Sequence, residues 1–194
     1  MGLDATLVVV TLQRYSRHLW MQRLLFTYAG PRPSTRRVQM NVAVIIGVSA
    51  SRGLGAAIAR RFAAGGLHTV VAGRTAERLE LVVEEIAAAG GTASACVTDA
   101  TDKAALDQLM SYAVSQGVVE AVVFNVGNNL PLAFDDLTED LFEEFWRTCT
   151  LSGFLTAKAA LPVLLDEGGS LLFTGASASL RGRPGFAHFS AAKA

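Results

Sequence analysis

Short apolar runs alternate with amphipathic segments from residue 41 to the end of the chain. A continuous apolar run is typical of a strand buried on both faces of a parallel sheet, and apolar residues spaced by three or four positions are typical of a helix with one buried face. The runs predict strands over residues 42–46, 67–72, 92–98, 119–125 and 170–174.

Amphipathic segments fill the gaps between these strands. They predict helices from residue 54 to the Gly65-Gly66 pair, over 77–88 with Thr75 as candidate N-cap, over 102–114, from the cap Thr138 to near 165, and from near Phe186 onward. Because strands and helices alternate strictly, the strands are expected to be parallel and joined by right-handed crossovers. The sequence therefore predicts an α/β fold with a doubly wound parallel sheet, whose ligands bind beyond the carboxyl ends of the strands.

Residues 1–40 differ in composition from residues 41–194. They hold six arginines and one acid, Asp4, for a net charge of +5, whereas residues 41–194 hold 11 basic and 16 acidic residues, for a net charge of −5. The Arg-rich start fits an organelle transit segment, or an extension from a start codon placed too far upstream with Met40 as the natural start. We favour the second interpretation and predict a domain over 41–194 behind an extension over 1–40.

Composition excludes several classes of protein. With 51% apolar and 18% charged residues, the chain is neither a disordered tail nor a coiled coil, and its zero net charge argues against a general nucleic-acid binder. No uninterrupted apolar run approaches the roughly 18 residues of a membrane span. Cys96 and Cys149 match no metal-ligand spacing and suggest a reducing compartment. We expect no metal and no membrane partner. The expected location is the cytoplasm, or the mitochondrion if residues 1–40 are a transit segment.

A glycine-containing loop follows the first predicted strand and opens a helix. Glycines let the backbone approach a pyrophosphate closely, and the free N–H groups at a helix start hold the anion. An ordinary tight turn is the alternative. The candidate phosphate-binding residues of this loop are Gly47, Ser49, Ser51, Arg52, Gly53, Leu54 and Gly55.

At this loop the sequence resembles the short-chain dehydrogenase/reductase family, whose loop has the pattern Thr-Gly-x-x-x-Gly-x-Gly. The stretch from Ser51 to Gly55 is similar to the second half of that pattern. The first half departs, because alignment on the strand makes Gly47 the first glycine with two inserted residues, whereas alignment on spacing places Ser49 there. The resemblance covers residues 41–194 and implies a Rossmann-type domain that is incomplete at its C-terminal side.

The end of the second strand bears on the choice of dinucleotide. A carboxylate there usually bonds the ribose of NAD, and an arginine suits the 2′-phosphate of NADP. Here the strand ends in Ala72-Gly73-Arg74, and Arg52 is the second guanidinium that would converge on the phosphate. We therefore expect NADP rather than NAD.

Two more segments extend the resemblance at successive strand ends. Asp99 and Ala100 look like the family's acidic segment after the third strand, whose carboxylate contacts the adenine amino group. Asn125, Val126 and Gly127 look like its Asn-Asn-Ala-Gly segment, which supports the sheet and borders the cofactor. The resemblance adds these five residues to the cofactor-binding set.

The catalytic positions of the family are mostly replaced. The family's Tyr-x-x-x-Lys pattern falls on residues 189–193, where Lys193 is kept and Phe189 replaces the tyrosine that serves as general acid/base. Ala176 stands at the serine position, with Ser177 one residue later, and Thr150 replaces the asparagine. The resemblance implies that Lys193 binds the ribose and takes part in catalysis. Ser177 is the other catalytic candidate, and a turn serine is its alternative.

The chain ends one residue after Lys193, so the fifth predicted strand is expected to be an unpaired edge in a fragment of low stability. The resemblance implies an NADP-dependent oxidoreductase that transfers a hydride between the cofactor and a small carbonyl or alcohol substrate. The alternatives are a non-catalytic dinucleotide-binding protein and an inactive fragment. A homo-oligomer is expected of a full-length relative but not of this chain.

Overall fold

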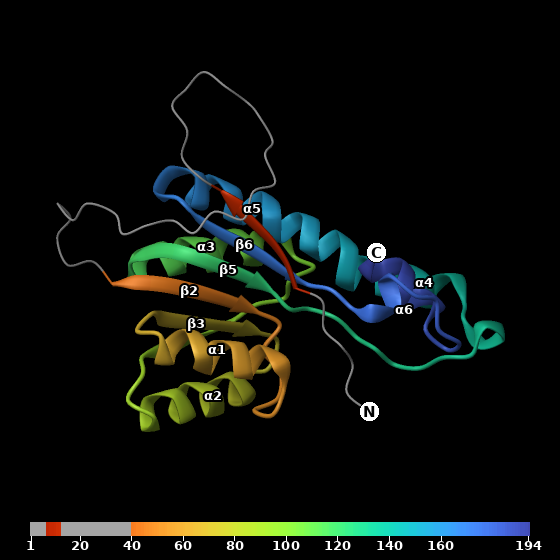
Figure 1. Cartoon of the computed structure of the whole chain (residues 1–194), viewed down its shortest axis with the longest axis horizontal. Helices are drawn as coiled ribbons and strands as arrows, with labels where there is room; N and C mark the ends of the chain where they lie inside the picture. The colour runs from red at the N-terminus through yellow and green to blue at the C-terminus, as the bar shows by residue number, and fades with distance from the viewer. Residues whose placement is uncertain (1–6, 13–39) are drawn as a thin grey trace, which may run out of the picture.

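The computed structural model describes residues 7–12 and 40–194, which form one six-stranded sheet with helices on both faces (Figure 1). The strands are β1 (Leu7–Leu12), β2 (Asn41–Ile46), β3 (His68–Gly73), β4 (Ala93–Val97), β5 (Val118–Phe124) and β6 (Gly169–Thr174). Their order across the sheet is β1-β6-β5-β2-β3-β4, and β2 to β6 pair in parallel. The predicted doubly wound parallel sheet is thereby confirmed.

The helices lie close to their predicted positions. They are α1 (Leu54–Ala64), α2 (Ala76–Ala88), α3 (Lys103–Gln116), α4 (Glu139–Trp146), α5 (Ser152–Glu167) and α6 (Ala187–Lys193), with short 3₁₀ turns η1 (Phe134–Asp136) and η3 (Ser177–Ser179). The predicted helix from Thr138 is interrupted by a π-helical turn, η2 (Arg147–Leu151), between α4 and α5. The Thr138 hydroxyl caps α4 by accepting from the Leu141 N–H at 3.3 Å.

The two faces of the sheet carry separate cores. α1 and α2 cover one face, where Ala43 and Ile45 of β2 pack with Leu79. α3 and α5 cover the other face, where Val44 packs with Leu164 (Figure 1). Because neighbouring residues of β2 point to opposite faces and both faces are covered, the strand is apolar throughout.

The outer edge of β6 is paired, so the expectation of an unpaired edge there is wrong. β1 runs antiparallel to β6 along its whole length, from Leu7 opposite Thr174 to Leu12 opposite Gly169. The apolar run at residues 7–12 can supply this strand because its backbone N–H and C=O groups replace water at the edge. β1 lies within the predicted extension, and residues 1–6 and 13–39 lie outside the described residues.

The continuous helical run Glu139–Asp166 is long and apolar enough to cross a membrane by length and composition alone. In the fold it lies against the sheet, where Ala160 and Leu164 are fully buried in the core formed with α3. Core packing accounts for part of its apolar character, and other large apolar side chains of the same run, Phe142, Trp146, Phe154 and Leu165, are exposed.

Candidate functional site

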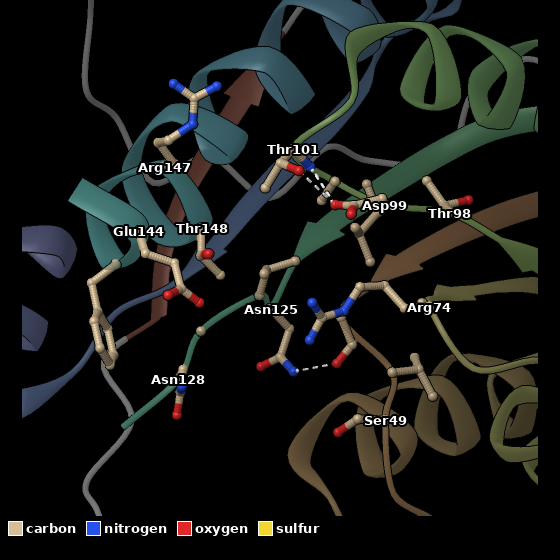
Figure 2. A pocket seen from close by; sticks show the side chains of 18 of the residues that line it. Ser49, Arg74, Thr98, Asp99, Thr101, Asn125, Asn128, Glu144, Arg147 and Thr148 are labelled. Carbon is tan, nitrogen blue, oxygen red and sulfur yellow. Dashed lines mark hydrogen bonds between the residues drawn. The ribbon is translucent and has the colours of Figure 1, made fainter. Parts of the chain in front are cut away.

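An open cleft of about 690 Å³ lies beyond the carboxyl ends of β2, β3, β4 and β5 (Figure 2). In the sheet β2 has β3 on one side and β5 on the other, so the chain connections after these strands diverge at this point. Such a switch point is the usual ligand position in an open α/β sheet.

Many of the predicted cofactor residues meet in this cleft. The predicted residues that line it are Gly47, Ser49, Arg74, Asp99, Ala100, Asn125, Val126 and Gly127. The predicted residues that do not line it are Ser51, Arg52, Gly53, Leu54, Gly55, Lys193 and Ser177. The strand ends thus contribute most of the lining, and the later part of the loop lies behind it.

Gly47 is the loop position at which the structure requires glycine. Its φ is +95°, and a Cβ there would lie 2.6 Å from the carbonyl carbon of Asn125. The Asn125 side-chain amide donates to the Gly47 carbonyl at 3.1 Å, which ties the ends of β2 and β5 together (Figure 2). Ser49 also lines the cleft but has no positive φ. The glycine requirement therefore agrees with alignment of the loop on the strand.

Gly55 lets the start of α1 approach this crossing closely. A Cβ at residue 55 would lie 2.7 Å from the Gly47 carbonyl oxygen. The first turn of α1 contains no acidic residue. Its N–H groups therefore present an uncompensated positive dipole end beside the loop.

Arg74 and Asp99 place opposite charges at neighbouring strand ends. The Asp99 carboxylate accepts from the backbone N–H of Thr101 at 2.9 Å and from its hydroxyl at 2.8 Å. The hydrogen bond from the Thr101 backbone, followed by that from its side chain and the nearby Arg74 guanidinium, lowers the pKa of Asp99 against an opposing effect of burial. Asp99 is therefore held as a carboxylate at the cleft wall (Figure 2).

Lys193 lies at the ends of β5 and β6, next to the cleft. Its ammonium donates to the Val126 carbonyl at 2.7 Å and to the Thr174 carbonyl at 3.1 Å. Burial lowers the pKa of Lys193, and the nearby Cys149 opposes this shift. Two of the three N–H donors of the ammonium are thus used by backbone, which leaves one for a ligand.

Phe189 is packed in an apolar cluster and brings no proton to the site. It is 6% exposed and contacts Ala176 and Ala178, with Phe186 packed against them. Ser177 begins η3 and is half-buried, and its carbonyl accepts from the Arg181 N–H at 3.0 Å.

Thr150 lies in the π-helical turn, at the position where the family has asparagine, and contacts the C-terminal end of α6. Its hydroxyl donates to the Ala192 carbonyl at 2.8 Å, one residue before Lys193. Thr150 therefore anchors the helix end that carries the lysine, a contact that motif comparison does not reveal.

One wall of the cleft was missed by sequence reasoning. It comes from α4 and η2, which contribute Asp140, Glu143, Glu144 and Arg147 (Figure 2). These residues follow the three-to-four-residue spacing of one helix face, which was the available signal. The sequence did not reveal that this exposed polar face also borders the cleft at the strand ends.

The cleft can hold an extended anionic ligand. Gly47 leaves room for close backbone approach, α1 presents N–H groups nearby, and Arg74 supplies a cation. Within residues 7–12 and 40–194, no group of three or more His, Cys, Asp or Glu side chains is arranged to hold a metal ion. The glycine, the helix start and the guanidinium suit phosphate groups.

Comparisons with known proteins agree with this geometry. Residues 41–194 match the family model described as short chain dehydrogenase. An uncharacterized oxidoreductase of Mycobacterium tuberculosis is 36% identical over 162 residues, which cover 81% of this chain and 60% of that protein. The chain therefore spans about 60% of the length of this curated relative.

Two solved structures show which ligands such folds hold. A 7α-hydroxysteroid dehydrogenase in complex with NADH and 7-oxo glycochenodeoxycholic acid has a TM-score of 0.73 and 29% identity, covering 81% of this chain and 61% of that one. An alcohol dehydrogenase from the archaeon Thermococcus sibiricus, in complex with 5-hydroxy-NADP, has a TM-score of 0.71 and 29% identity, covering 79% of this chain and 66% of that one. Similar structures thus carry nicotinamide dinucleotides of both kinds.

Proposed function

The chain belongs to the short-chain dehydrogenase family, and we propose that it binds NADP(H) in the strand-end cleft and acts on a small carbonyl or alcohol substrate. Members of this family are oxidoreductases that use nicotinamide dinucleotides, and their substrates are small molecules. The preference for NADP and the substrate class are the parts that we propose for this chain.

Arg74 carries the proposed preference for NADP. It directly follows β3 and lines the cleft, at the position where a carboxylate would instead favour the ribose hydroxyl of NAD. The acid Asp99, which also lines the cleft, belongs to the end of the next strand and is held by Thr101. A guanidinium at the end of β3 would form charge-assisted hydrogen bonds with the 2′-phosphate.

The remaining cleft residues would hold the rest of the cofactor. Gly47 and the start of α1 would face the pyrophosphate, and Asn125 fixes the loop that borders it. The free N–H of Lys193 would donate to a ribose hydroxyl. When bound, the dinucleotide supplies or accepts the hydride.

Proton transfer is the step for which this chain lacks the family's tyrosine. A carbonyl that receives a hydride becomes an alkoxide and needs a proton from a group within hydrogen-bond reach. Phe189 has no such proton, so we propose that the Ser177 hydroxyl or a water molecule bound near the Lys193 ammonium supplies it. Slow turnover is therefore expected.

Phe189 also supports a second function, a non-catalytic dinucleotide-binding protein. Its ring is buried among Ala176 and Ala178, so the family's tyrosine and serine positions form an apolar cluster. A chain with this cluster would keep the cofactor cleft and lack turnover.

One experiment tests both functions. Purified chain is titrated with NADPH while cofactor fluorescence is followed, and NADPH oxidation is then measured with a panel of small aldehydes and ketones. Saturable binding with slow oxidation supports the enzyme, and saturable binding without oxidation supports the binding protein. Lack of saturable binding by a folded chain would contradict both.

A further inference from the structure

Side chains of α1 and α2 form hydrogen bonds with the turn of the phosphate loop. The Ser51 hydroxyl donates to the Glu85 carboxylate at 2.5 Å, and the Arg60 guanidinium donates to the same carboxylate at 2.8 Å. A second Arg60 N–H donates to the Ser51 backbone carbonyl at 2.9 Å. Residues of the loop, α1 and α2 thus close a ring of three hydrogen bonds, which we name the loop latch (Ser51, Arg60 and Glu85).

The latch holds the centre of a tight turn. The Gly53 N–H donates to the Ala50 carbonyl at 2.8 Å, so Ser51 and Arg52 are the two central residues of this turn. Because the Ser51 hydroxyl donates to Glu85, which does not line the cleft, the Ser51 side chain is directed away from the cleft. This placement explains why Ser51, a predicted phosphate ligand, does not line the cleft.

Charge balance makes the latch compatible with an anionic ligand. An unpaired Glu85 carboxylate behind the loop would repel phosphate groups, but Arg60 neutralises it by an ion pair. Their side chains are 36% and 32% exposed, so the pair is partly shielded from solvent. The loop therefore gains two side-chain anchors without net negative charge.

We propose that Arg60 and Glu85 are positioning residues that hold the phosphate-loop turn in its cofactor-binding conformation. One expectation rests on the proposed function: the NADPH dissociation constant should rise when the latch is broken. The structural part of the inference concerns only the turn and is measurable without any cofactor. Neither residue lines the cleft, so both act through the loop and not by contact with the ligand.

Limited trypsin digestion of the native chain reports on the turn directly. Arg52 is exposed and lies at the centre of the turn, so cleavage after Arg52 requires the turn to open into an extended conformation. We expect Glu85→Ala to accelerate this cleavage at least fivefold relative to cleavage after the exposed Arg78, with products identified by mass spectrometry. Ser51→Ala, which leaves the Arg60–Glu85 pair in place, should give a smaller acceleration.

Glu84→Ala is the matched control, because Glu84 is the exposed neighbour of Glu85 on α2. It should leave cleavage after Arg52 unchanged. In the same variants the NADPH dissociation constant should rise about tenfold for Glu85→Ala and stay constant for Glu84→Ala, while the far-ultraviolet circular dichroism of both stays as in the natural chain.

Unchanged cleavage after Arg52 in both Glu85→Ala and Ser51→Ala, or equal acceleration in Glu84→Ala, would overturn the inference. If Glu85→Ala fails to fold, the Ser51→Ala comparison decides. Faster cleavage with an unchanged NADPH dissociation constant would overturn the positioning role. Lack of NADPH binding by the natural chain would instead contradict the proposed function, and the cleavage comparison would still decide whether the latch holds the turn.

Discussion

Lys193 fits against Gly127 so closely that a Cβ at residue 127 would lie 2.9 Å from the lysine Cε. The lysine reaches the Val126 and Thr174 carbonyls across this small residue. Gly127 is therefore needed for space beside the ammonium, and its backbone φ is not in the left-handed region.

Gly127→Ala is expected to displace Lys193 from its two carbonyl partners. Because the added Cβ would meet the flexible end of the lysine side chain at an exposed position, the free energy of unfolding in urea should change little, while NADPH binding should weaken as the ammonium is displaced. Gly182→Ala is the control, because a Cβ there would meet nothing within 4 Å. Equal NADPH affinity in Gly127→Ala and the natural chain would show that Lys193 does not depend on this contact.

Phe189→Tyr is expected to create or raise turnover. A positioned general acid typically contributes about 10²–10⁴-fold to the rate, and residue 189 lies on the same helix as the retained Lys193. NADPH oxidation with a panel of aldehydes and ketones measures the effect. Phe186→Tyr, which alters a phenylalanine packed against the same cluster, should give no gain. If the Phe189→Tyr variant folds and binds NADPH but gains no turnover, the missing proton donor is not the only group that the site lacks.

His68 is expected to make stability fall in mild acid. Burial lowers the pKa of His68 below its ordinary value of 6.5, and its Nε2 lies 3.0 Å from the Ser94 hydroxyl. Between the lowered pKa and 6.5 the unfolded chain binds more protons than the native one, so stability rises with pH across this window and is lost as pH falls through it.

His68→Gln should flatten this part of the profile. The measurement is the free energy of unfolding in urea at several pH values from about 7.5 to about 5, where histidine titrates. As the pH falls, the free energy of unfolding of the natural chain should decrease more steeply than that of the variant. Parallel profiles would show that His68 does not contribute to acid sensitivity.

Periodicity was sufficient for the parallel part of the fold because each strand is buried on both faces. The run at residues 42–46 is apolar since Val44 and Ile45 enter opposite cores, and this pattern is visible without any tertiary information. The sequence left two alignments of the loop open, on Gly47 or on Ser49, and the crossing at Gly47, which permits no Cβ, agrees with the first of them. The loop glycine, Arg74 and the polar residues at the strand ends were therefore predicted together.

Contacts between distant segments were not predictable in the same way. The pairing of β1 with β6 joins residues more than 150 positions apart and depends on which edge is available. The Ser51–Glu85 hydrogen bond joins the loop to a helix through side chains whose types are equally common on exposed faces. The π-helical turn at Arg147–Leu151 interrupts the helix that the periodicity predicts as continuous, and no residue type in the segment indicates it.

The relative affinity for NADPH and NADH tests the central claim most directly. Dissociation constants of both cofactors should be measured by fluorescence for the natural chain, for Arg74→Gln and for Arg78→Gln, an exposed control on α2. A hydrogen bond to a charged group is worth about 1.5–3 kcal/mol, so NADPH should bind at least about tenfold more tightly than NADH, and only Arg74→Gln should remove this preference. Equal binding of the two cofactors, tighter binding of NADH, or a preference that survives Arg74→Gln would contradict the account.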